Sequence, residues 1–408
     1  SIILMNTQLK TIFVFLFLVC TLRGTAQNFS IDYPSYQNRN SDALEISRIV
    51  RNDTATILYM DAYSRPNYWL RLASGLSLHG NQTGKNYPII RSQGFELNKE
   101  VYMPASGNIT FILQFAPLAP QEETIDFIEG TNKGDFQIKD ISLNKQEKKG
   151  KIHCHISGKI IDSPQSSRLV LMKAHKNPSS SPWLSIPIRN GEFQYDFYAD
   201  HEEVYEVFIW NDMLTGSWLP SLFFAENGPV SFTLYPASTR KPGLVSTSNP
   251  LTCELQQLES ERKAKFNFDS LYAQMNKLYE ENRFESEALQ TLWKRIEQVK
   301  DNNEERNNIY RERDRLEESG EAYTEEGKAL LVKIKQLNEE MNQWTIKHIK
   351  QNPSLPGLYV LTSKTEMACK GEDVTPFLNA YQETFASLYP EPVSYTHLRA
   401  HETLSDLV

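Results

Sequence analysis

The sequence predicts a multidomain β-plus-α protein in which two antiparallel β-sandwich-like modules are followed by a charged helical region. Two observations support this fold class. Residues 28–236 consist of short segments rich in β-branched and aromatic residues, separated by turn-forming residues, which is typical of an antiparallel sandwich. From residue 254 onward, apolar residues recur at helical spacing among charges of both signs. A chain of 408 residues, 40% of them apolar, is long enough for two or three packed domains.

The first β-rich module is expected over residues 28–145. Within it, the segment 108–115 places an apolar residue at every second position, which predicts a half-buried antiparallel strand. A charged segment, residues 144–151, marks its end. Strands are expected at Thr54–Tyr63, Tyr68–Leu78, Asn86–Ile90, Phe95–Val101, Asn108–Phe115, Thr124–Ile128 and Phe136–Leu143.

The second sandwich-like module is expected over residues 152–236, where turn-forming residues separate short strands and no helical period occurs between them. After it, residues 237–253 are rich in Ser, Thr, Pro and Gly and predict a linker. The strands of this module are expected at Ile152–Ile161, Leu169–Ala174, Glu192–Tyr198, Val204–Trp210 and Val230–Tyr235.

Residues 254–390 are expected to be helical. Three long helices, with breaks near Ser319-Gly320 and Asn352-Pro353, should be followed by shorter ones over Leu355–Met367 and Asp373–Leu388. The interspersed charges favour a solvated bundle or hairpin. A calmodulin-like or membrane-surface role is the alternative.

Residues 1–26 are expected to be upstream codons followed by a signal peptide, with Met5 as the start. The apolar run Ile12–Cys20 is shorter than the roughly 20 residues that a membrane-spanning helix needs. Small residues precede an expected cleavage between Ala26 and Gln27. We therefore expect export to the periplasm or cell envelope.

Two alternatives to soluble export stay open. The apolar run could act as a short membrane anchor, or Cys20 could be lipidated. Val19 argues against lipidation, because such signals normally have Gly or Ala at that position. No second apolar stretch approaches spanning length, so no transmembrane helix is expected in the mature chain.

Residues 393–408 resemble a translated sequencing adapter, and we expect them to be a non-native tail. The chain would then be truncated, with the natural protein continuing past Pro392. His397 and His401 have the i, i+4 spacing of two zinc ligands on one helix face, but their place in this tail favours an artefact.

The composition excludes several classes of function. A net charge of −8 argues against a nucleic-acid partner. The sequence has no phosphate loop, nucleophile elbow or dinucleotide fingerprint, so no catalytic residue and no cofactor are assigned. Cleavage of the signal would leave Cys154, Cys253 and Cys369 without any Cys-x-x-Cys pair. Whether these three cysteines form a disulfide stays open.

Two small clusters are weak candidates for chemistry. His153 and His155 would share one face of a strand and could bind a metal, while Cys154 would point to the other face. No third ligand is marked, so a pair of partly exposed histidines around a buried cysteine is preferred. Asp126 and Glu129 could perform acid–base chemistry or bind calcium, but acids at a strand end and a turn are the preferred interpretation.

A set of aromatic residues could form a platform for a sugar or peptide. Sequence alone does not show whether these rings are exposed. Core packing is the favoured alternative, because large aromatic residues are buried more often than exposed. These residues are Tyr68, Trp69, Trp183, Trp210 and Trp218.

Several stretches carry a resemblance to a known family. With the order of the modules, they resemble the front half of envelope thiol–disulfide oxidoreductases of the TlpA/ResA kind from Gram-negative anaerobes, in which a β domain precedes a thioredoxin-like (AhpC/TSA-type) domain. The resemblance covers nearly all of residues 28–390. The stretches are 106–118 (SGNITFILQFAPL) with 125–130 (IDFIEG), 156–160 (ISGKI), 224–232 (FAENGPVSF), and 349–359 (IKQNPSLPGLY) with 381–390.

The resemblance implies that the thioredoxin domain, with its Trp-Cys-x-x-Cys motif, would lie beyond Pro392 and is absent from this chain. The chain would then be an exported accessory or recognition region of a thiol–disulfide oxidoreductase. Its partners would be envelope proteins or the missing thioredoxin domain. The alternative is an exported β-sandwich binding module that recognises a glycan or a cell-surface protein, with an exposed aromatic row as its signature. A third possibility is that the long helices pair protomers, and the oligomeric state stays open.

Overall fold

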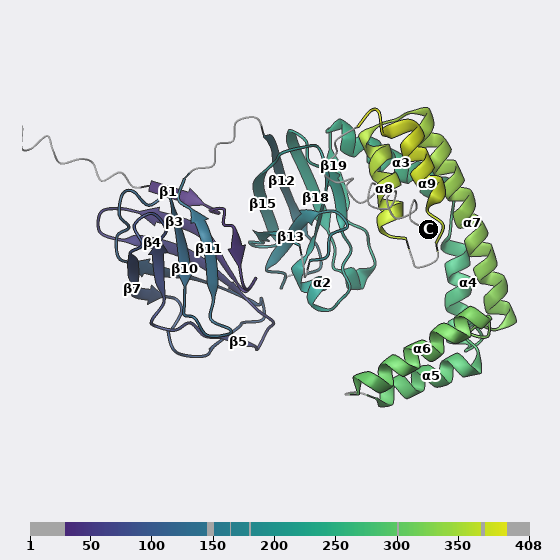
Figure 1. Cartoon of the computed structure of the whole chain (residues 1–408), viewed down its shortest axis with the longest axis horizontal. Helices are drawn as coiled ribbons and strands as arrows, with labels where there is room; N and C mark the ends of the chain where they lie inside the picture. Colours follow the sequence, from purple (N-terminus) through teal and green to yellow (C-terminus); the bar gives the residue numbers. More distant parts are fainter. Residues whose placement is uncertain are drawn as a thin grey trace, which may run out of the picture. The chain divides into compact units, whose positions relative to one another are not determined.

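The computed structural model describes residues 29–144, 151–163, 165–178, 181–299, 302–368 and 372–389. The chain divides into two compact units, one ending at Ser246 and the other beginning at Thr247. The first unit holds two β domains and the second is helical (Figure 1). The expected signal peptide with its Ala26–Gln27 cleavage, Cys369 and the tail 393–408 all lie outside the described residues.

The first β domain is one nine-stranded sheet in the order β1-β3-β4-β9-β7-β6-β10-β11-β2, accompanied by a separate two-stranded ribbon, β5-β8. The sheet encloses a core of buried apolar side chains from both of its halves. Strand β9 buries Phe111, Leu113 and Phe115, which confirms the predicted half-buried strand. The strands are β1 Phe29–Asp32, β2 Asn38–Arg39, β3 Leu44–Arg51, β4 Thr56–Tyr63, β5 Trp69–Leu70, β6 Ser77–Gly80, β7 Asn86–Gln93, β8 Val101–Tyr102, β9 Asn108–Phe115, β10 Thr124–Ile128 and β11 Gln137–Ser142.

Two strands predicted for this domain are mostly loop. Only two residues of the segment 68–78 pair in β5 before β6 begins, and β8 starts where the predicted strand 95–101 ends. The reason is local: Asn98 has a left-handed backbone (φ 63°), and its side-chain oxygen accepts a hydrogen bond from the Ser74 amide at 2.9 Å. Side-chain hydrogen bonds of this kind compete with strand pairing.

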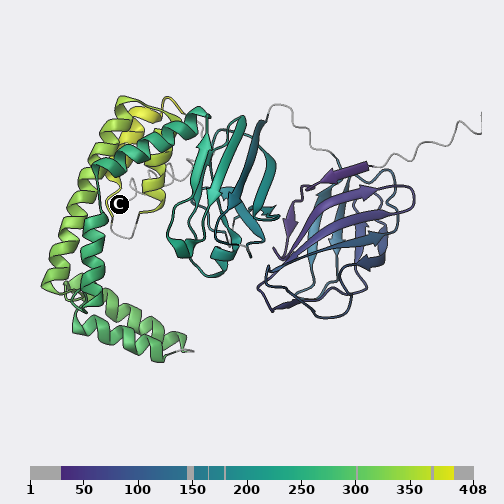
Figure 2. The same ribbon diagram turned by 180° about the vertical axis from the view of Figure 1, so that it is seen from behind.

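The second β domain packs two four-stranded sheets around a shared apolar core (Figure 2). Their orders are β15-β12-β18-β19 and β14-β13-β16-β17. One pair, β12 with β18, is parallel and was not predicted. Strand β19 lies inside the predicted linker 237–253. The elements are β12 Ile152–Ile160, β13 Arg168–Lys173, β14 Leu184–Pro187, β15 Glu192–Ala199, β16 Val204–Ile209, α2 Trp210–Leu214, β17 Ser221–Phe224, β18 Gly228–Leu234, the 3₁₀ turn η1 Ala237–Thr239 and β19 Leu244–Thr247.

The two β domains meet around Arg168, whose side chain is 0% exposed. Its guanidinium carbon lies 4.0 Å from the ring centre of Tyr63 in the first domain, and 4.3 and 5.0 Å from those of Trp210 and Trp183 in the second. Nη1 donates to the Asp42 carbonyl at 3.0 Å, and Nη2 lies 3.6 Å from the Asp42 carboxylate. Burial lowers the pKa of Arg168 to about 10, which leaves the side chain charged at neutral pH.

Further contacts between the domains surround this buried cation. Arg189 donates to the Asp61 carboxylate at 3.2 Å. The rings of Tyr33 and Tyr195 meet edge to face, with their centres 5.3 Å apart. The junction therefore combines the buried Arg168 cation, the Arg189–Asp61 ion pair and aromatic contacts.

The helical unit contains more helices than predicted. Among the described residues of the segment 254–350 there are five helices rather than three, because the chain also breaks before α4 and before α5. At the second of these breaks Asn282 is left-handed (φ 54°), and the Ser286 side chain caps α5. The predicted breaks at Gly320 and Asn352 are confirmed. The helices are α3 Pro250–Lys265, α4 Asp269–Glu280, α5 Glu287–Gln298, α6 Asn303–Ser319, α7 Glu325–Gln351, α8 Leu355–Glu366, α9 Thr375–Ala380 and the π-helix η2 Tyr381–Phe385.

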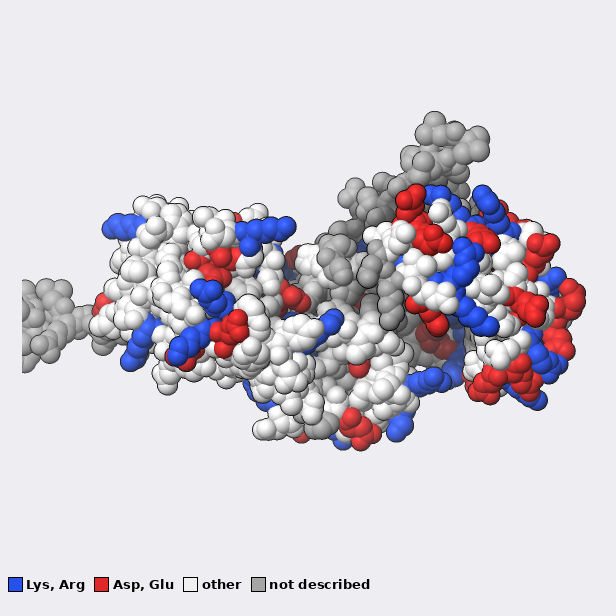
Figure 3. Space-filling view, turned by 90° about the horizontal axis from the view of Figure 1, so that it is seen from below, with Lys and Arg blue, Asp and Glu red and all other residues white. Residues whose placement is uncertain are grey.

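Charges of both signs cover the exposed face of the helical unit, at the right of Figure 3. Several are paired, including Arg295 with Glu312 at 2.8 Å and Arg283 with Glu326 at 2.6 Å. This agrees with the expected solvated bundle. Within the described part of the chain, no helix is both long enough and apolar enough to cross a membrane.

Replacing Arg168 with alanine should lower the free energy of unfolding of the β unit by on the order of 3 kcal/mol. The change removes desolvated cation–π contacts and charge-assisted hydrogen bonds and leaves a cavity. Arg168→Met keeps most of the volume and should cost less, and Arg91→Ala on the exposed surface should change little. Urea unfolding followed by near-ultraviolet circular dichroism measures all three. An Arg168→Ala loss no larger than that of Arg91→Ala would show that the cation is dispensable.

Candidate functional site

The two candidate metal ligands lie on the exposed face of β12, and Cys154 lies on the buried face between them, as predicted. Asp196 on β15 contacts both rings through Oδ1, at 2.7 Å from His153 Nε2 and 3.1 Å from His155 Nδ1. Partial burial opposes ionisation of Asp196, but hydrogen bonds from the two histidines outweigh it and lower its pKa. Among the described residues, no group of three or more His, Cys, Asp or Glu side chains is arranged to hold a metal ion.

The two acids Asp126 and Glu129 hold separate parts of the backbone. Asp126 accepts hydrogen bonds from the Asp140 amide at 2.8 Å and from Lys139 Nζ at 3.1 Å. Glu129 accepts from the amides of Ala73 at 2.6 Å and Phe136 at 2.8 Å. Each carboxylate therefore pins a strand end or a loop, which agrees with the preferred interpretation.

The two described cysteines are free thiols in different surroundings. Cys154 is buried in the core of the second β domain, and burial raises the pKa of its thiol to about 12. Cys253 is exposed at the start of α3 and donates to the Thr247 carbonyl at 3.4 Å. A thiol with so high a pKa as that of Cys154 is a poor nucleophile at neutral pH.

Glu206 on β16 is a buried carboxyl group that the sequence analysis did not select. It is 6% exposed and lies opposite Met172 and Leu222 on the neighbouring strands. Burial raises its pKa to about 7, and a backbone hydrogen bond at His175 opposes this shift only in part. No pattern in the sequence marks this position, because its neighbours along the strand are ordinary β residues.

Three of the five candidate aromatic residues pack within the second β domain or at its junction with the first. Trp183 and Trp210 surround Arg168. Trp218 stacks on Phe208 with ring centres 5.6 Å apart. The core-packing interpretation therefore holds for these three.

The other two candidates lie on the surface of the first β domain, together with a third ring. Tyr68 is 58% exposed, Trp69 48% and Tyr102 59%. We call these three residues the aromatic ledge. Trp69 pairs with Tyr102 in the β5-β8 ribbon, which Figure 1 shows at the edge of this domain. Tyr102 was not among the candidates, because it becomes a neighbour of Trp69 only through strand pairing.

The ribbon that carries the ledge is attached to the core on its other side. Leu70 and Val101, the second pair in the ribbon, pack against the apolar core of the domain. The Met103 amide donates to the Tyr68 carbonyl at 2.7 Å, which extends the ribbon by one hydrogen bond. The ledge therefore consists of the outward pair Trp69 and Tyr102 of a short ribbon that the core holds in place, with Tyr68 directly before it.

Polar side chains border the ledge. Glu100 accepts a hydrogen bond from the Tyr102 hydroxyl at 3.1 Å. Arg71 is exposed two residues after Trp69, and the Arg65 guanidinium carbon lies 6.0 Å from the centre of the Tyr68 ring. Exposed rings beside charged hydrogen-bonding groups form a surface suited to binding rather than to acid–base chemistry.

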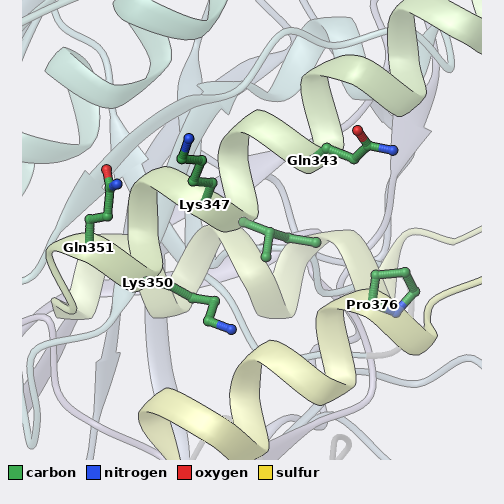
Figure 4. A pocket seen from close by; sticks show the side chains of 6 residues that line it. Gln343, Lys347, Lys350, Gln351 and Pro376 are labelled. Carbon is green, nitrogen blue, oxygen red and sulfur yellow. The ribbon is translucent and has the colours of Figure 1, made fainter.

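The helical unit has a hollow of about 480 Å³ between α7 and α9. Figure 4 shows Gln343, Lys347, Lys350 and Gln351 on α7, with Pro376 across from them. Lys350 is already paired with Glu383 at 2.5 Å. A second hollow of about 340 Å³ lies between α3, α4 and α7. The linings of these hollows contain no arrangement of groups that suggests a reaction, so the aromatic ledge is the better candidate site.

The protein should lose stability between about pH 4.5 and pH 7 because of Glu206. The folded state holds this proton more tightly than the unfolded chain, so stability is greatest below the unfolded pKa and falls as pH rises through the folded pKa. A shift from 4.5 to about 7 corresponds to on the order of 3 kcal/mol. Glu206→Gln should remove this loss, whereas Glu202→Gln, an exposed neighbour, should keep it. Urea unfolding at pH 5 and pH 8 measures the change in the free energy of unfolding between the two pH values. An equal change in wild type and in Glu206→Gln would contradict the prediction.

Comparisons with known proteins add no family to this description. No family model and no curated protein matches the chain. Among solved structures, pullulanase type I from Bacillus subtilis complexed with maltose matches at 11% identity over 41% of this chain and 23% of its own, with a TM-score of 0.13. Pullulanase from Bacillus acidopullulyticus matches at 9% identity over 43% and 34%, with a TM-score of 0.13. The T6 backbone pilin of serotype M6 Streptococcus pyogenes matches at 9% identity over 49% and 51%, with a TM-score of 0.13. The matched part thus spans at most about half of those chains, and scores this low carry no argument about fold or function.

Proposed function

We propose that this chain is the exported, non-catalytic recognition region of a thiol–disulfide oxidoreductase of the TlpA/ResA kind. In this proposal the aromatic ledge is the binding surface. The carrying observation is the exposure of three neighbouring aromatic rings. Trp69 and Tyr102 pair in the ribbon and Tyr68 directly precedes it, and each ring is about half exposed or more. Exposed apolar groups that gather in one place mark a site of interaction more often than single ones do.

The arrangement of the thiols supports the non-catalytic part of the proposal. Catalytic cysteines of thiol–disulfide exchange need an accessible thiolate of lowered pKa. Cys154 has the opposite properties, since it is buried and its pKa is raised to about 12. Cys253 is exposed but belongs to no Cys-x-x-Cys motif. In the proposed protein the exchange chemistry belongs to a thioredoxin-like domain, and this chain supplies recognition.

A second candidate function is an independent exported binding module for a glycan or a cell-surface protein. The same ledge favours it, because an exposed aromatic row is the expected signature of such a module. The two candidates differ in whether the natural gene also encodes a Trp-Cys-x-x-Cys motif. A gene with such a motif within about one domain length of this sequence, on the order of 150 residues, would support the oxidoreductase, and a gene without it would favour the binding module.

The purified chain should not catalyse reduction of insulin by dithiothreitol above the uncatalysed rate. Insulin turbidity measures this, with a thioredoxin as positive control. In the folded chain, iodoacetamide should label Cys253 within minutes and leave Cys154 unmodified until denaturant is added, as peptide mass mapping can show. Catalytic turnover that disappears in Cys253→Ser would overturn the non-catalytic assignment.

A further inference from the structure

The outer side of the β5-β8 ribbon presents one pair of rings, and a pair of charged residues flanks it. Trp69 pairs with Tyr102 in the antiparallel register, and paired residues share one side of a ribbon. Arg71 directly follows β5 and Glu100 directly precedes β8. Glu100 lies beside the rings, because it accepts a hydrogen bond from the Tyr102 hydroxyl at 3.1 Å. All four are exposed.

The chemistry of these pairs points to a carbohydrate. The apolar C–H face of a sugar ring packs well on an aromatic ring, while its neighbouring hydroxyl groups suit a guanidinium or a carboxylate, each of which can make two parallel hydrogen bonds. We propose that the aromatic ledge binds a neutral polysaccharide, with Trp69 and Tyr102 as ring contacts and Arg71 and Glu100 as hydroxyl ligands. This inference rests on the recognition role of the ledge, which both candidate functions share.

The spacing of the ribbon suits a chain of sugars. The Cβ atoms of directly opposed residues in an antiparallel pair are about 5 Å apart, which is comparable to the length of one sugar unit in an extended chain. A polysaccharide that crosses the ribbon would therefore place consecutive rings near Trp69 and near Tyr102.

The borders of the ledge favour a neutral sugar over the other ligand classes. An apolar peptide segment would need a pocket, but Leu70 and Val101 face the core and add nothing to the outer side. A polyanion would need an excess of positive charge. Beside the ledge, Glu100 offsets one of the two arginines Arg65 and Arg71, and the Lys99–Glu96 ion pair is neutral, so the border carries no strong excess of positive charge.

The full chain is tested by affinity electrophoresis in gels that contain amylopectin, xylan, mixed-linkage β-glucan or galactomannan. At least one polysaccharide should retard the chain. Trp69→Ala should weaken binding by about tenfold and Glu100→Gln by about three- to tenfold, as expected for the loss of one ring contact or one charged hydrogen bond. Two matched controls remove exposed apolar groups elsewhere: Ile90→Ala in the same domain and Tyr272→Ala in the helical unit. Their affinity for the polysaccharide should stay within about twofold of that of the wild type.

Each remaining outcome has a defined meaning. Circular dichroism checks that Trp69→Ala still folds like the wild type. If this variant does not fold, Glu100→Gln tests the contribution of the ledge. Retardation by none of the polysaccharides, or retardation that both ledge variants leave unchanged, would overturn the inference. Reduced carboxymethylated α-lactalbumin serves as a polypeptide probe. Ledge-dependent binding of this probe alone would overturn the carbohydrate assignment and leave the proposed recognition function standing. If neither the polysaccharides nor the polypeptide probe loses any binding in the two ledge variants, the proposed function is overturned as well.

Discussion

The organisation of the β unit depends on a single buried positive charge. Arg168 is enclosed by Tyr63 from one domain and by Trp183 and Trp210 from the other, and its Nε and Nη2 atoms have no hydrogen-bond partner among the described residues. Burying a charge in this way is costly unless other contacts compensate for it. The compensation here is the aromatic rings, the carbonyl of Asp42 and nearby acids. Because guanidinium is planar and only weakly hydrated, it can be desolvated between rings in a way that a lysine ammonium cannot. The two β domains are thus held together by a contact that requires residues from both.

A second set of charged groups determines the loops of the first β domain. Glu122 is buried, and burial opposes its ionisation, but hydrogen bonds from Thr83, Tyr87 and the Gln82 amide outweigh this and lower its pKa. Asp126 and Glu129 hold neighbouring strand ends through backbone amides. In this domain, these acids hold loops in place through hydrogen bonds. The loop between β5 and β6, which comes directly after Trp69 and Leu70, is held by Glu129, so the ledge is attached to a fixed part of the domain.

The limits of prediction from sequence depend on the range of the interactions. Alternation identifies β9 with its correct ends, and Gly320 and Asn352 mark the ends of α6 and α7, because these signals are local. The parallel pairing of β12 with β18 joins strands separated by most of a domain, and local patterns carry no information about it. The same limit explains why Arg168 and Glu206 were not selected as buried charges. Of the candidate site, Tyr68 and Trp69 were named in advance, whereas Tyr102 becomes their neighbour only through strand pairing.

The structure also bears on why a recognition surface would be placed on so short a ribbon. A two-stranded ribbon is marginal by itself and needs a core contact to persist. Leu70 and Val101 supply that contact, and their inward orientation forces Trp69 and Tyr102 outward, because successive residues of a strand point to opposite sides. Exposure of the ledge is therefore a consequence of anchoring rather than a defect of packing. A surface fixed in this way loses little conformational freedom when a ligand binds, which favours binding by a few preorganised rings.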